Sequence, residues 1–411
     1  MVNLDNNHAS ISEAIDGGLL AGAVTLVWHA GQVVQVNELG HRDIAARLPM
    51  QRDTIFRIAS MSKPVTVAAA MTLVEEGLFR LDDPVARWLP EIAGLRVLIE
   101  PRSALDDTTA LRRPITFDDL MTHRAGFAYP FSITGPLAKA YGRLSFRQNE
   151  ERWLTELAQL PLAHQPGTRI TYSHGTDVLG IAISRMAGKP LHELLAERIF
   201  EPLGMTDTGF AVSLAQRRRM ATMYGLAADD LPDSSSLRPP SLRDDVMGPP
   251  ALTPPEFCAG GAGLLSTADD YLTFARMLLG EGTVDGVRVL SPESVRLMRT
   301  DRLTADQKEQ NFLGVPFWIG RGFGLSMSVV TDPAQSERFF GPGGLGTFGW
   351  PGAFGTWWQA DPANDVIVLY LIQNYPDLTA DVAQVAGNTS VAKLRMAQPK
   401  FVRRTYQGLG L

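Results

Sequence analysis

The chain has 411 residues, of which 45% are hydrophobic and 20% are charged, and its formal net charge is −6 at pH 7. This is an ordinary globular composition, and the length favours two lobes over one small core. The scattered basic residues argue against a nucleic-acid partner, and the single cysteine, Cys258, excludes an intramolecular disulfide. No stretch reaches the ~18 consecutive apolar residues of a membrane span, and no secretion-signal pattern is present. We therefore expect a cytoplasmic protein without a membrane partner.

The first part of the chain predicts a helix, a β-hairpin, a short strand and a long helix. In chain order these elements cover residues 8–20, 23–29 and 33–38, 54–58, and 61–76. The strands are recognised by short apolar runs between turn residues, and the helices by apolar residues at helical spacing.

Helical periods dominate the middle of the chain. The expected helices cover residues 117–123, 148–159, 176–187, 191–200, 267–280 and 291–299. Residues 231–255 are rich in proline and predict an extended surface loop, either a lid or a dimer arm.

The last third predicts strands again, followed by a terminal helix. The strands cover residues 323–330, 337–340, 354–360 and 366–372, and the helix covers residues 379–396. Strands at both ends with helices between them predict an α+β fold, in which both termini build one antiparallel sheet flanked by helices. The expected domains are an α/β domain of residues 1–79 and 256–411, and a mainly helical inserted domain of residues 80–255.

Ser60 and Lys63 are the first candidates for catalysis, because they stand three residues apart at the start of the long helix. Positions i and i+3 share one face of a helix, so the hydroxyl and the amine can meet. A serine hydroxyl becomes a good nucleophile when a neighbouring base removes its proton. A helix N-cap serine followed by a solvated lysine explains the same pair without chemistry.

Two further segments can supply a proton carrier and oxyanion donors. Tyr172 and His174 stand at the mouth of the helix predicted over residues 176–187. A phenol beside a lysine ammonium favours the phenolate, which could accept the serine proton. Glycines 346, 349, 352 and 355 lead into a strand, where backbone N–H groups can approach a ligand closely. A core tyrosine and an ordinary glycine-rich turn are the structural alternatives.

Taken together, three motifs carry a family resemblance: Ser60-x-x-Lys63, Tyr172-Ser173-His174 and Trp350-Pro351-Gly352. They resemble the serine β-lactamase and D-alanyl-D-alanine peptidase superfamily. Within it, the chain is similar to the class C β-lactamase-related esterases, the family VIII carboxylesterases. Residues 56–64, 120–126 and 201–205 support the likeness, which runs from about residue 10 to about residue 395.

The resemblance implies a role for each matching residue. Ser60 would be the acylated nucleophile, Lys63 would relay a proton, and Tyr172 would be the general base for acylation and then activate water. The N–H groups of Ser60 and Ala353 would form the oxyanion hole beside Gly352.

Two departures from the class C pattern bear on the substrate. His174 stands where those enzymes have asparagine, and we expect it to orient the substrate; Trp350 stands where they have the lysine that neutralises a β-lactam carboxylate. A tryptophan offers an apolar face instead. We therefore expect a serine carboxylesterase acting on short-chain or aryl esters, without a cofactor or a metal.

Several alternatives stay open at this point. The same acyl-enzyme could transfer its acyl group to an alcohol, or the protein could hydrolyse β-lactams or D-amino peptides. A penicillin-binding sensor that has lost turnover is the non-enzymatic alternative. The sequence also leaves a homo-oligomer open.

Overall fold

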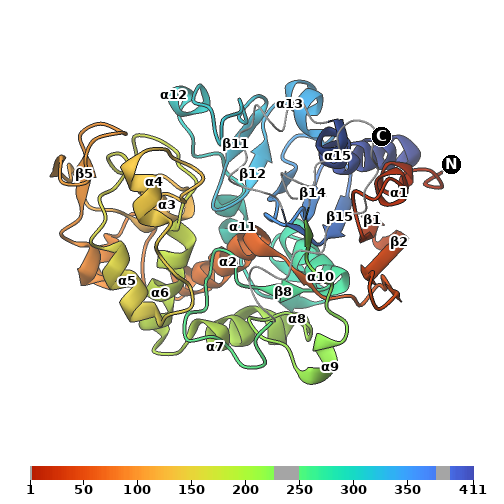
Figure 1. Ribbon diagram of the computed structural model, residues 1–411, viewed down its shortest axis with the longest axis horizontal. Helices are drawn as coiled ribbons and strands as arrows, with labels where there is room; N and C mark the ends of the chain where they lie inside the picture. The colour runs from red at the N-terminus through yellow and green to blue at the C-terminus, as the bar shows by residue number, and fades with distance from the viewer. Residues whose placement is uncertain (1, 226–249, 376–388) are drawn as a thin grey trace.

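The computed structural model describes residues 2–225, 250–375 and 389–411. Its centre is an antiparallel sheet of eight strands (Figure 1). In spatial order these are β11 (Arg321–Phe323), β12 (Ser328–Val330), β13 (Phe348–Gly349), β14 (Trp357–Asp361), β15 (Val366–Ile372), β1 (Gly22–His29), β2 (Gln32–Asp43) and β3 (Leu48–Pro49).

The two halves of the chain meet where β1 pairs with β15. Their register runs from Ala23 opposite Ile372 to His29 opposite Val366. Every residue of β15, and all of β1 except His29, is buried, so both faces of this part of the sheet must be covered. The predicted antiparallel sheet built by both termini is confirmed.

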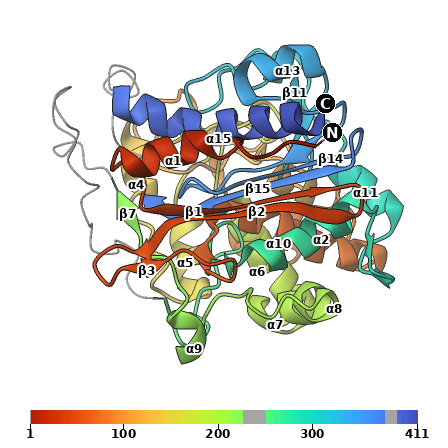
Figure 2. The same ribbon diagram turned by 90° about the vertical axis from the view of Figure 1, so that its right-hand side faces the viewer.

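Helices cover the two faces of the sheet (Figure 2). Helices α1 (Ala9–Asp16) and α15 (Thr389–Leu409) lie side by side on one face, over apolar residues that include Val27 and Val368. On the other face lie α2 (Ser62–Glu75) and α10 (Ala268–Leu279). Alternation along the strands sends successive side chains to these two separate cores.

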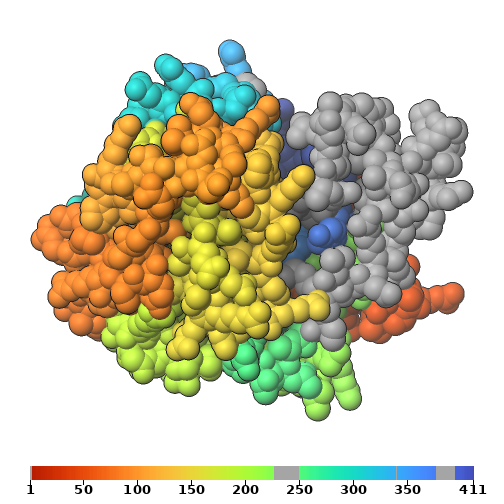
Figure 3. Space-filling view, turned by 60° about the vertical axis from the view of Figure 1, so that its left-hand side comes forward, coloured from red at the N-terminus to blue at the C-terminus, as the bar shows by residue number. Residues whose placement is uncertain are grey.

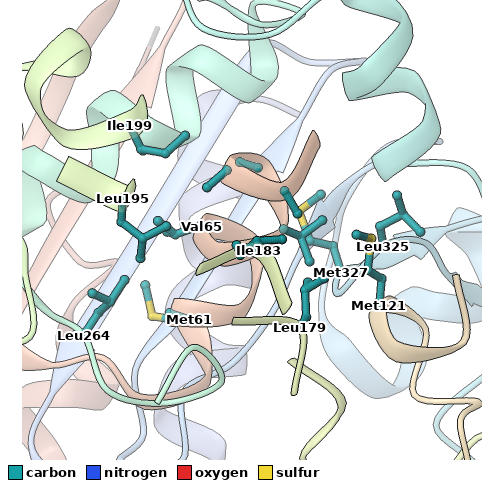
Figure 4. Packing of buried hydrophobic residues seen from close by; sticks show 14 of the residues in the cluster. Met61, Val65, Met121, Leu179, Ile183, Leu195, Ile199, Leu264, Leu325 and Met327 are labelled. Atoms are coloured by element: carbon teal, nitrogen blue, oxygen red, sulfur yellow. The ribbon is translucent and has the colours of Figure 1, made fainter. Parts of the chain in front are cut away.

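Helix α2 is buried on all sides, since residues 62–73 are all inaccessible to solvent. Figure 4 shows Met61 and Val65 among apolar side chains of other elements, including Leu195, Leu264 and Ile183, which belong to the same buried cluster. A helix that is apolar around its whole circumference belongs in a core. The helix that directly follows the candidate nucleophile Ser60 is therefore held rigidly.

The remaining helices lie between α2 and α10 in sequence or follow α10. They are α3 (Phe117–Met121), α4 (Pro136–Tyr141), α5 (Glu150–Leu157), α6 (Gly175–Ala187), α7 (Leu191–Leu195), α8 (Glu201–Leu203), α9 (Leu214–Arg217), α11 (Pro292–Met298), α12 (Ala305–Lys308) and α13 (Pro333–Phe340). Helices α3 to α6 gather on the side of α2 away from the sheet (Figure 1), and their segment forms much of the face seen in Figure 3. The division into two domains at residues 79 and 256 stays a prediction.

Four small two-stranded sheets complete the described fold. They are β4 (Phe56–Arg57) with β8 (Leu265–Ser266), β5 (Arg96–Leu98) with β6 (Thr108–Ala110), β9 (Thr283–Val284) with β10 (Val287–Arg288), and the parallel pair β7 (Tyr224–Gly225) with β16 (Asn374–Tyr375).

Three predicted elements need correction. The strand expected at residues 337–340 is part of helix α13, which Asp332 caps by accepting the N–H of Gln335 and which Pro333 opens. The strand expected at 323–330 is a hairpin of β11 and β12, because Ser326 has a φ of 59°. The terminal helix extends to Leu409 instead of residue 396, and residues 379–388 lie outside the described part.

Most of the proline-rich segment, residues 231–249, also lies outside the described residues. Within the described ranges, no helix combines the length and the apolar character needed to cross a membrane.

Candidate active site

Ser60 lies at the junction between strand β4 and helix α2, in a single 3-10 turn of residues 59–61. Strand β4 is fixed by its pairing with β8, and Ala59 has a φ of 44°. A left-handed alanine is a strained conformation that survives only when the surrounding structure imposes it. Strained turns of this kind commonly present a catalytic side chain, so the position of Ser60 fits a nucleophile.

Lys63 contacts Ser60 as the i to i+3 spacing predicts. Its Nζ lies 3.1 Å from Ser60 Oγ, and the lysine side chain is 0% exposed. Pro64 follows in the first turn of α2 without breaking the helix. There it removes a backbone donor that has no intrahelical partner.

Tyr172 lies beside Lys63 but presents the face of its ring. Lys63 Nζ is 4.7 Å from the ring centroid of Tyr172, a cation–π contact. The phenol oxygen of Tyr172 is the partner of Trp350 Nε1 at 3.1 Å. Within the described residues, this oxygen makes no hydrogen bond to Ser60 or Lys63. The structure therefore brings the three predicted catalytic residues together, with Lys63 as the one that contacts the nucleophile.

Trp350 is buried and belongs to an aromatic cluster. Its ring centroid lies 5.6 Å from that of Tyr172 and 5.0 Å from that of Phe323. The indole was expected to face the substrate, and its observed contacts are with these core rings and the Tyr172 oxygen. Trp350 thus fixes the position of Tyr172.

Gly352 and Ala353 lie in the loop between β13 and β14, next to the turn that carries Ser60. A Cβ on Gly352 would stand only 2.4 Å from the carbonyl oxygen of Ile58, so only glycine allows this approach. Ala353 follows as an exposed residue, and its N–H donates to no backbone carbonyl in the described parts of the chain. Its role as an oxyanion donor stays a prediction that this placement supports.

His174 is a buried residue at the N-cap position of helix α6, and its side chain makes no capping hydrogen bond. It is 4% exposed, and its Nδ1 lies 2.9 Å from Asp177 Oδ2. Four aromatic rings surround its imidazole at centroid distances of 4.3–6.0 Å, those of Tyr129, Trp153, Phe146 and Tyr141. His174 was expected to touch substrate, and the structure directs it to Asp177 instead.

Three residues of the site were not identified from the sequence. Lys63 Nζ donates to Tyr129 Oη at 3.2 Å and to the carbonyl oxygen of Gly261 at 2.7 Å. The carboxylate of Asp177 accepts from Tyr129 Oη at 3.2 Å and from the N–H of Gly261 at 2.8 Å. A Cβ on Gly261 would lie 2.8 Å from Asp177 Oδ1, so the glycine is required. Two features of the sequence could have pointed to these residues: the Gly260-Gly261 pair, and Asp177 as an acidic residue in the first turn of α6.

Burial and neighbouring charges set the protonation of two more groups. Burial, the Asp177 carboxylate and then Tyr172 raise the pKa of Tyr129 well above its ordinary value, so this phenol keeps its proton. Burial and then Lys63 lower the pKa of His123 well below its ordinary value. His123 is therefore neutral, and its Nδ1 lies 3.1 Å from Ser173 Oγ. This agrees with a structural role for His123.

A hollow of about 380 Å³ adjoins Tyr172. Its apolar lining includes Ile133, Ile170 and Phe312, and its polar lining includes Arg169. Nearby, Phe131 stacks on Tyr129 at a centroid distance of 5.2 Å and is 38% exposed. In the described parts of the chain, no three His, Cys, Asp or Glu side chains are grouped so as to hold a metal ion.

A family profile described as Beta-lactamase matches residues 9–387. The chain belongs to the Beta-lactamase family. It is a serine hydrolase of the β-lactamase-related, esterase-like type, with the β-lactamase/transpeptidase fold.

Individual members of the family can be compared over most of their length. Protein Rv1367c of Mycobacterium tuberculosis is 62% identical over 411 residues, covering 100% of both chains. Esterase EstB of Burkholderia gladioli is 30% identical over 391 residues, covering 88% of both. The solved structure of EstCE1, described as a hydrolase with promiscuous acyltransferase activity, has a TM-score of 0.73 at 28% identity, covering 96% of this chain and 98% of EstCE1.

Proposed function

We propose that this member of the Beta-lactamase family is a carboxylesterase of the family VIII type, which hydrolyses short-chain or aryl esters through an acyl-enzyme on Ser60. The observation that carries the proposal is the contact of 3.1 Å between Lys63 Nζ and Ser60 Oγ at a buried, strained turn. The likeness to the esterases EstB and EstCE1 supports the choice of reaction.

In the acylation step, Ser60 Oγ attacks the ester carbonyl carbon and forms a new C–O bond. Its proton passes to the Lys63–Tyr172 pair, which acts as one base. Lys63 receives the proton first, because it is the member in contact with Oγ. This differs from the expectation that Tyr172 takes the proton directly.

Collapse of the tetrahedral intermediate breaks the bond to the leaving alcohol, which takes the proton from the pair. Donors from the backbone of Ser60 and Ala353 would hold the oxyanion, and one such donor contributes about 3–4 kcal/mol. Water then attacks the acyl-enzyme while the same pair accepts its proton. Collapse of the second tetrahedral intermediate breaks the bond between the acyl carbon and Ser60 Oγ, the pair returns its proton to Oγ, and the acid leaves.

The residues near the nucleophile favour a neutral substrate. Trp350 stands where class C β-lactamases have a cation, and the partly exposed ring of Phe131 lies near Tyr172. A site without that cation and with an exposed aromatic ring suits an alkyl or aryl group better than a carboxylate. The buried single cysteine agrees with a cytoplasmic location, which remains part of the proposal.

Acyl transfer to an alcohol is the second candidate, because EstCE1 is described as having promiscuous acyltransferase activity. The acyl-enzyme is common to both reactions, and only the nucleophile of the second step differs. Product analysis with added primary alcohol separates them, since transfer yields a new ester and hydrolysis yields the acid.

The decisive experiment is a substrate panel with the purified full chain. The panel contains p-nitrophenyl esters of increasing acyl length, a matched anilide, a chromogenic cephalosporin and a D-alanyl-D-alanine peptide. We expect turnover of the esters and a fluorophosphonate adduct on Ser60. Turnover of the cephalosporin or the peptide in preference to every ester would reject the esterase proposal, as would an adduct without multiple turnover.

A further inference from the structure

Lys63 is completely buried, and no carboxylate contacts it directly in the described residues. A charged amine in the protein interior is costly unless it is hydrogen-bonded and paired with an opposite charge. The nucleophile site therefore needs a counter-charge that the three predicted catalytic residues do not supply.

Asp177 is a carboxylate with the same burial, 0% exposed. Two separate bridges connect it to Lys63. One runs through the phenol of Tyr129, which lies 3.2 Å from both Lys63 Nζ and Asp177 Oδ2. The other runs through Gly261, whose carbonyl oxygen accepts from Lys63 at 2.7 Å and whose N–H donates to Asp177 Oδ1 at 2.8 Å.

The donors and acceptors in these bridges fix the direction of each hydrogen bond. A carboxylate only accepts, so the phenol proton of Tyr129 goes to Asp177, and the Tyr129 oxygen is left to accept from Lys63. The carbonyl of Gly261 also only accepts. Two N–H groups of Lys63 are therefore fixed, and the remaining position on Nζ faces Ser60 Oγ at 3.1 Å. When Lys63 is a neutral amine, this position holds the lone pair of Nζ. When Lys63 is an ammonium, the same position holds a proton.

We propose that Asp177 is a positioning residue for the acylation step, which orients Lys63 through Tyr129 and Gly261 and stabilises the ammonium that forms when the Ser60 proton arrives. This is the task of the third member of a nucleophile–base–acid triad, carried here by two bridges in place of a direct contact. The proposal rests on the proposed acyl-enzyme reaction for its catalytic consequence. The charge pairing itself can be tested without any substrate.

His174 competes for the same carboxylate, because its Nδ1 lies 2.9 Å from Asp177 Oδ2. A protonated His174 could neutralise Asp177 alone, in which case Lys63 would have no share in the pairing. The experiment must therefore distinguish coupling of Asp177 to Lys63 from coupling of Asp177 to His174.

The first test is a double-mutant cycle on thermal stability in one buffer. Lys63→Met and Asp177→Asn each leave one buried charge unpaired, and the double variant leaves none. We expect each single variant to lower the Tm, and the double variant to melt above both. Additive losses, or coupling of Asp177→Asn to His174→Gln alone, would overturn the proposal.

Asp361 provides the matched control. It is also 0% exposed, and its carboxylate likewise accepts from a backbone N–H, that of Gly344, and from a tyrosine, Tyr406, both at 2.8 Å. Asp361→Asn should lower the Tm additively with Lys63→Met, because it has no link to the site. Equal coupling of both aspartates to Lys63 would mean that the cycle reports general destabilisation, and would refute a specific link.

The second test is kinetic and does not require Asp177→Asn to fold. Tyr129→Phe removes one bridge and keeps the ring. We expect a loss in kcat of about 10-fold or more with KM nearly unchanged, and slower labelling of Ser60 by a fluorophosphonate. Tyr370→Phe is the control, since that buried phenol has no hydrogen-bond partner among the described residues, and it should leave kcat unchanged.

An unchanged kcat and labelling rate in Tyr129→Phe would overturn the positioning role. If the wild type hydrolysed no ester, the esterase proposal would fail while the Tm cycle and the labelling rate still decided the role of Asp177. If the wild type were active and the cycle additive, only the role of Asp177 would fail.

Discussion

The indole N–H of Trp350 donates a hydrogen bond of 3.1 Å to the phenol oxygen of Tyr172. An indole nitrogen is a donor only, so the Tyr172 oxygen must be the acceptor. The bond holds the phenol while Lys63 lies over the face of its ring at 4.7 Å. A residue expected to line the substrate pocket thus orients the phenol of a proposed catalytic residue.

This geometry predicts a kinetic effect of Trp350→Phe, which keeps an aromatic ring and removes the donor. A hydrogen bond to a charged group contributes about 1.5–3 kcal/mol, so kcat should fall by about 10-fold to 100-fold while KM changes little. Steady-state hydrolysis of p-nitrophenyl acetate measures both. Trp358→Phe is the control, because Trp358 is buried and its Nε1 lacks a partner in the described residues. Equal kcat for the two variants would show that the hydrogen bond is irrelevant to turnover.

Two serines at the same turn should separate chemistry from folding. Ser60→Ala should lose ester hydrolysis and the fluorophosphonate adduct while it keeps its Tm. Ser62→Ala should keep the adduct and lose stability, because Ser62 Oγ donates to the carbonyl of Ala59 at 2.6 Å and accepts from the N–H of Leu264 at 3.1 Å. An unsatisfied buried N–H costs about 1–3 kcal/mol. Mass spectrometry of the labelled protein and thermal melting distinguish them, and an adduct retained in Ser60→Ala would place the nucleophile elsewhere.

Tyr172→Phe should lower kcat by at least about 10², the scale of a lost general base. It removes the phenol oxygen that the proposed reaction assigns to the base pair, and it leaves the ring beneath the Lys63 amine. Tyr406→Phe is a control that removes a buried phenol far along the chain, one that donates to Asp361 at 2.8 Å. That variant should lose stability and keep kcat. Near-normal turnover by Tyr172→Phe would leave Lys63 as the sole base.

The sequence was sufficient for the Ser60–Lys63 contact, because helix geometry alone places i and i+3 on one face. It was sufficient for the antiparallel sheet, since the apolar run of residues 366–372 has strand length and a turn before it. It failed at residues 337–340, where apolar residues suggested a strand. Asp332 and Pro333 begin a helix there, and their N-terminal signal carried more information than the short apolar run.

The roles of Tyr129, Asp177 and His174 could not be read from the chain. The bond from Lys63 to Tyr129 joins residues 66 positions apart, and the bond from Tyr129 to Asp177 spans another 48. Only tertiary packing sets such contacts. An aspartate in the first turn of a helix also has a sufficient local explanation in the helix dipole, so the indirect link of Asp177 to Lys63 left no separate mark in the sequence.

His164 predicts a sensitivity of the folded protein to acid. Burial lowers its pKa from 6.5 to about 4. Below the unfolded-state value, the unfolded chain binds a proton that the folded protein does not, so stability falls as pH drops from about 6.5 to about 4, by roughly 3 kcal/mol. Above about pH 6.5, the contribution of His164 to stability no longer changes with pH. Urea midpoints at several pH values should show a weaker pH dependence for His164→Asn than for the wild type. Parallel curves of urea midpoint against pH for the two proteins would show that His164 does not contribute to the pH dependence of stability.

Phe131 offers the clearest prediction for substrate preference. It stacks on Tyr129 at an interplanar angle of 10° with 38% of its surface exposed, so part of its ring is open beside Tyr129 and Tyr172. An aromatic pair contributes about 0.5–1.5 kcal/mol beyond its buried area, so Phe131→Ala should raise KM for a naphthyl ester by about 3-fold to 10-fold and leave kcat nearly unchanged. The KM for ethyl acetate should hardly move, since that ester has no ring to stack. Leu214→Ala, at an exposed position on α9, should change neither value. An equal rise in KM for both esters would mean that Phe131 shapes the entrance without choosing between substrates.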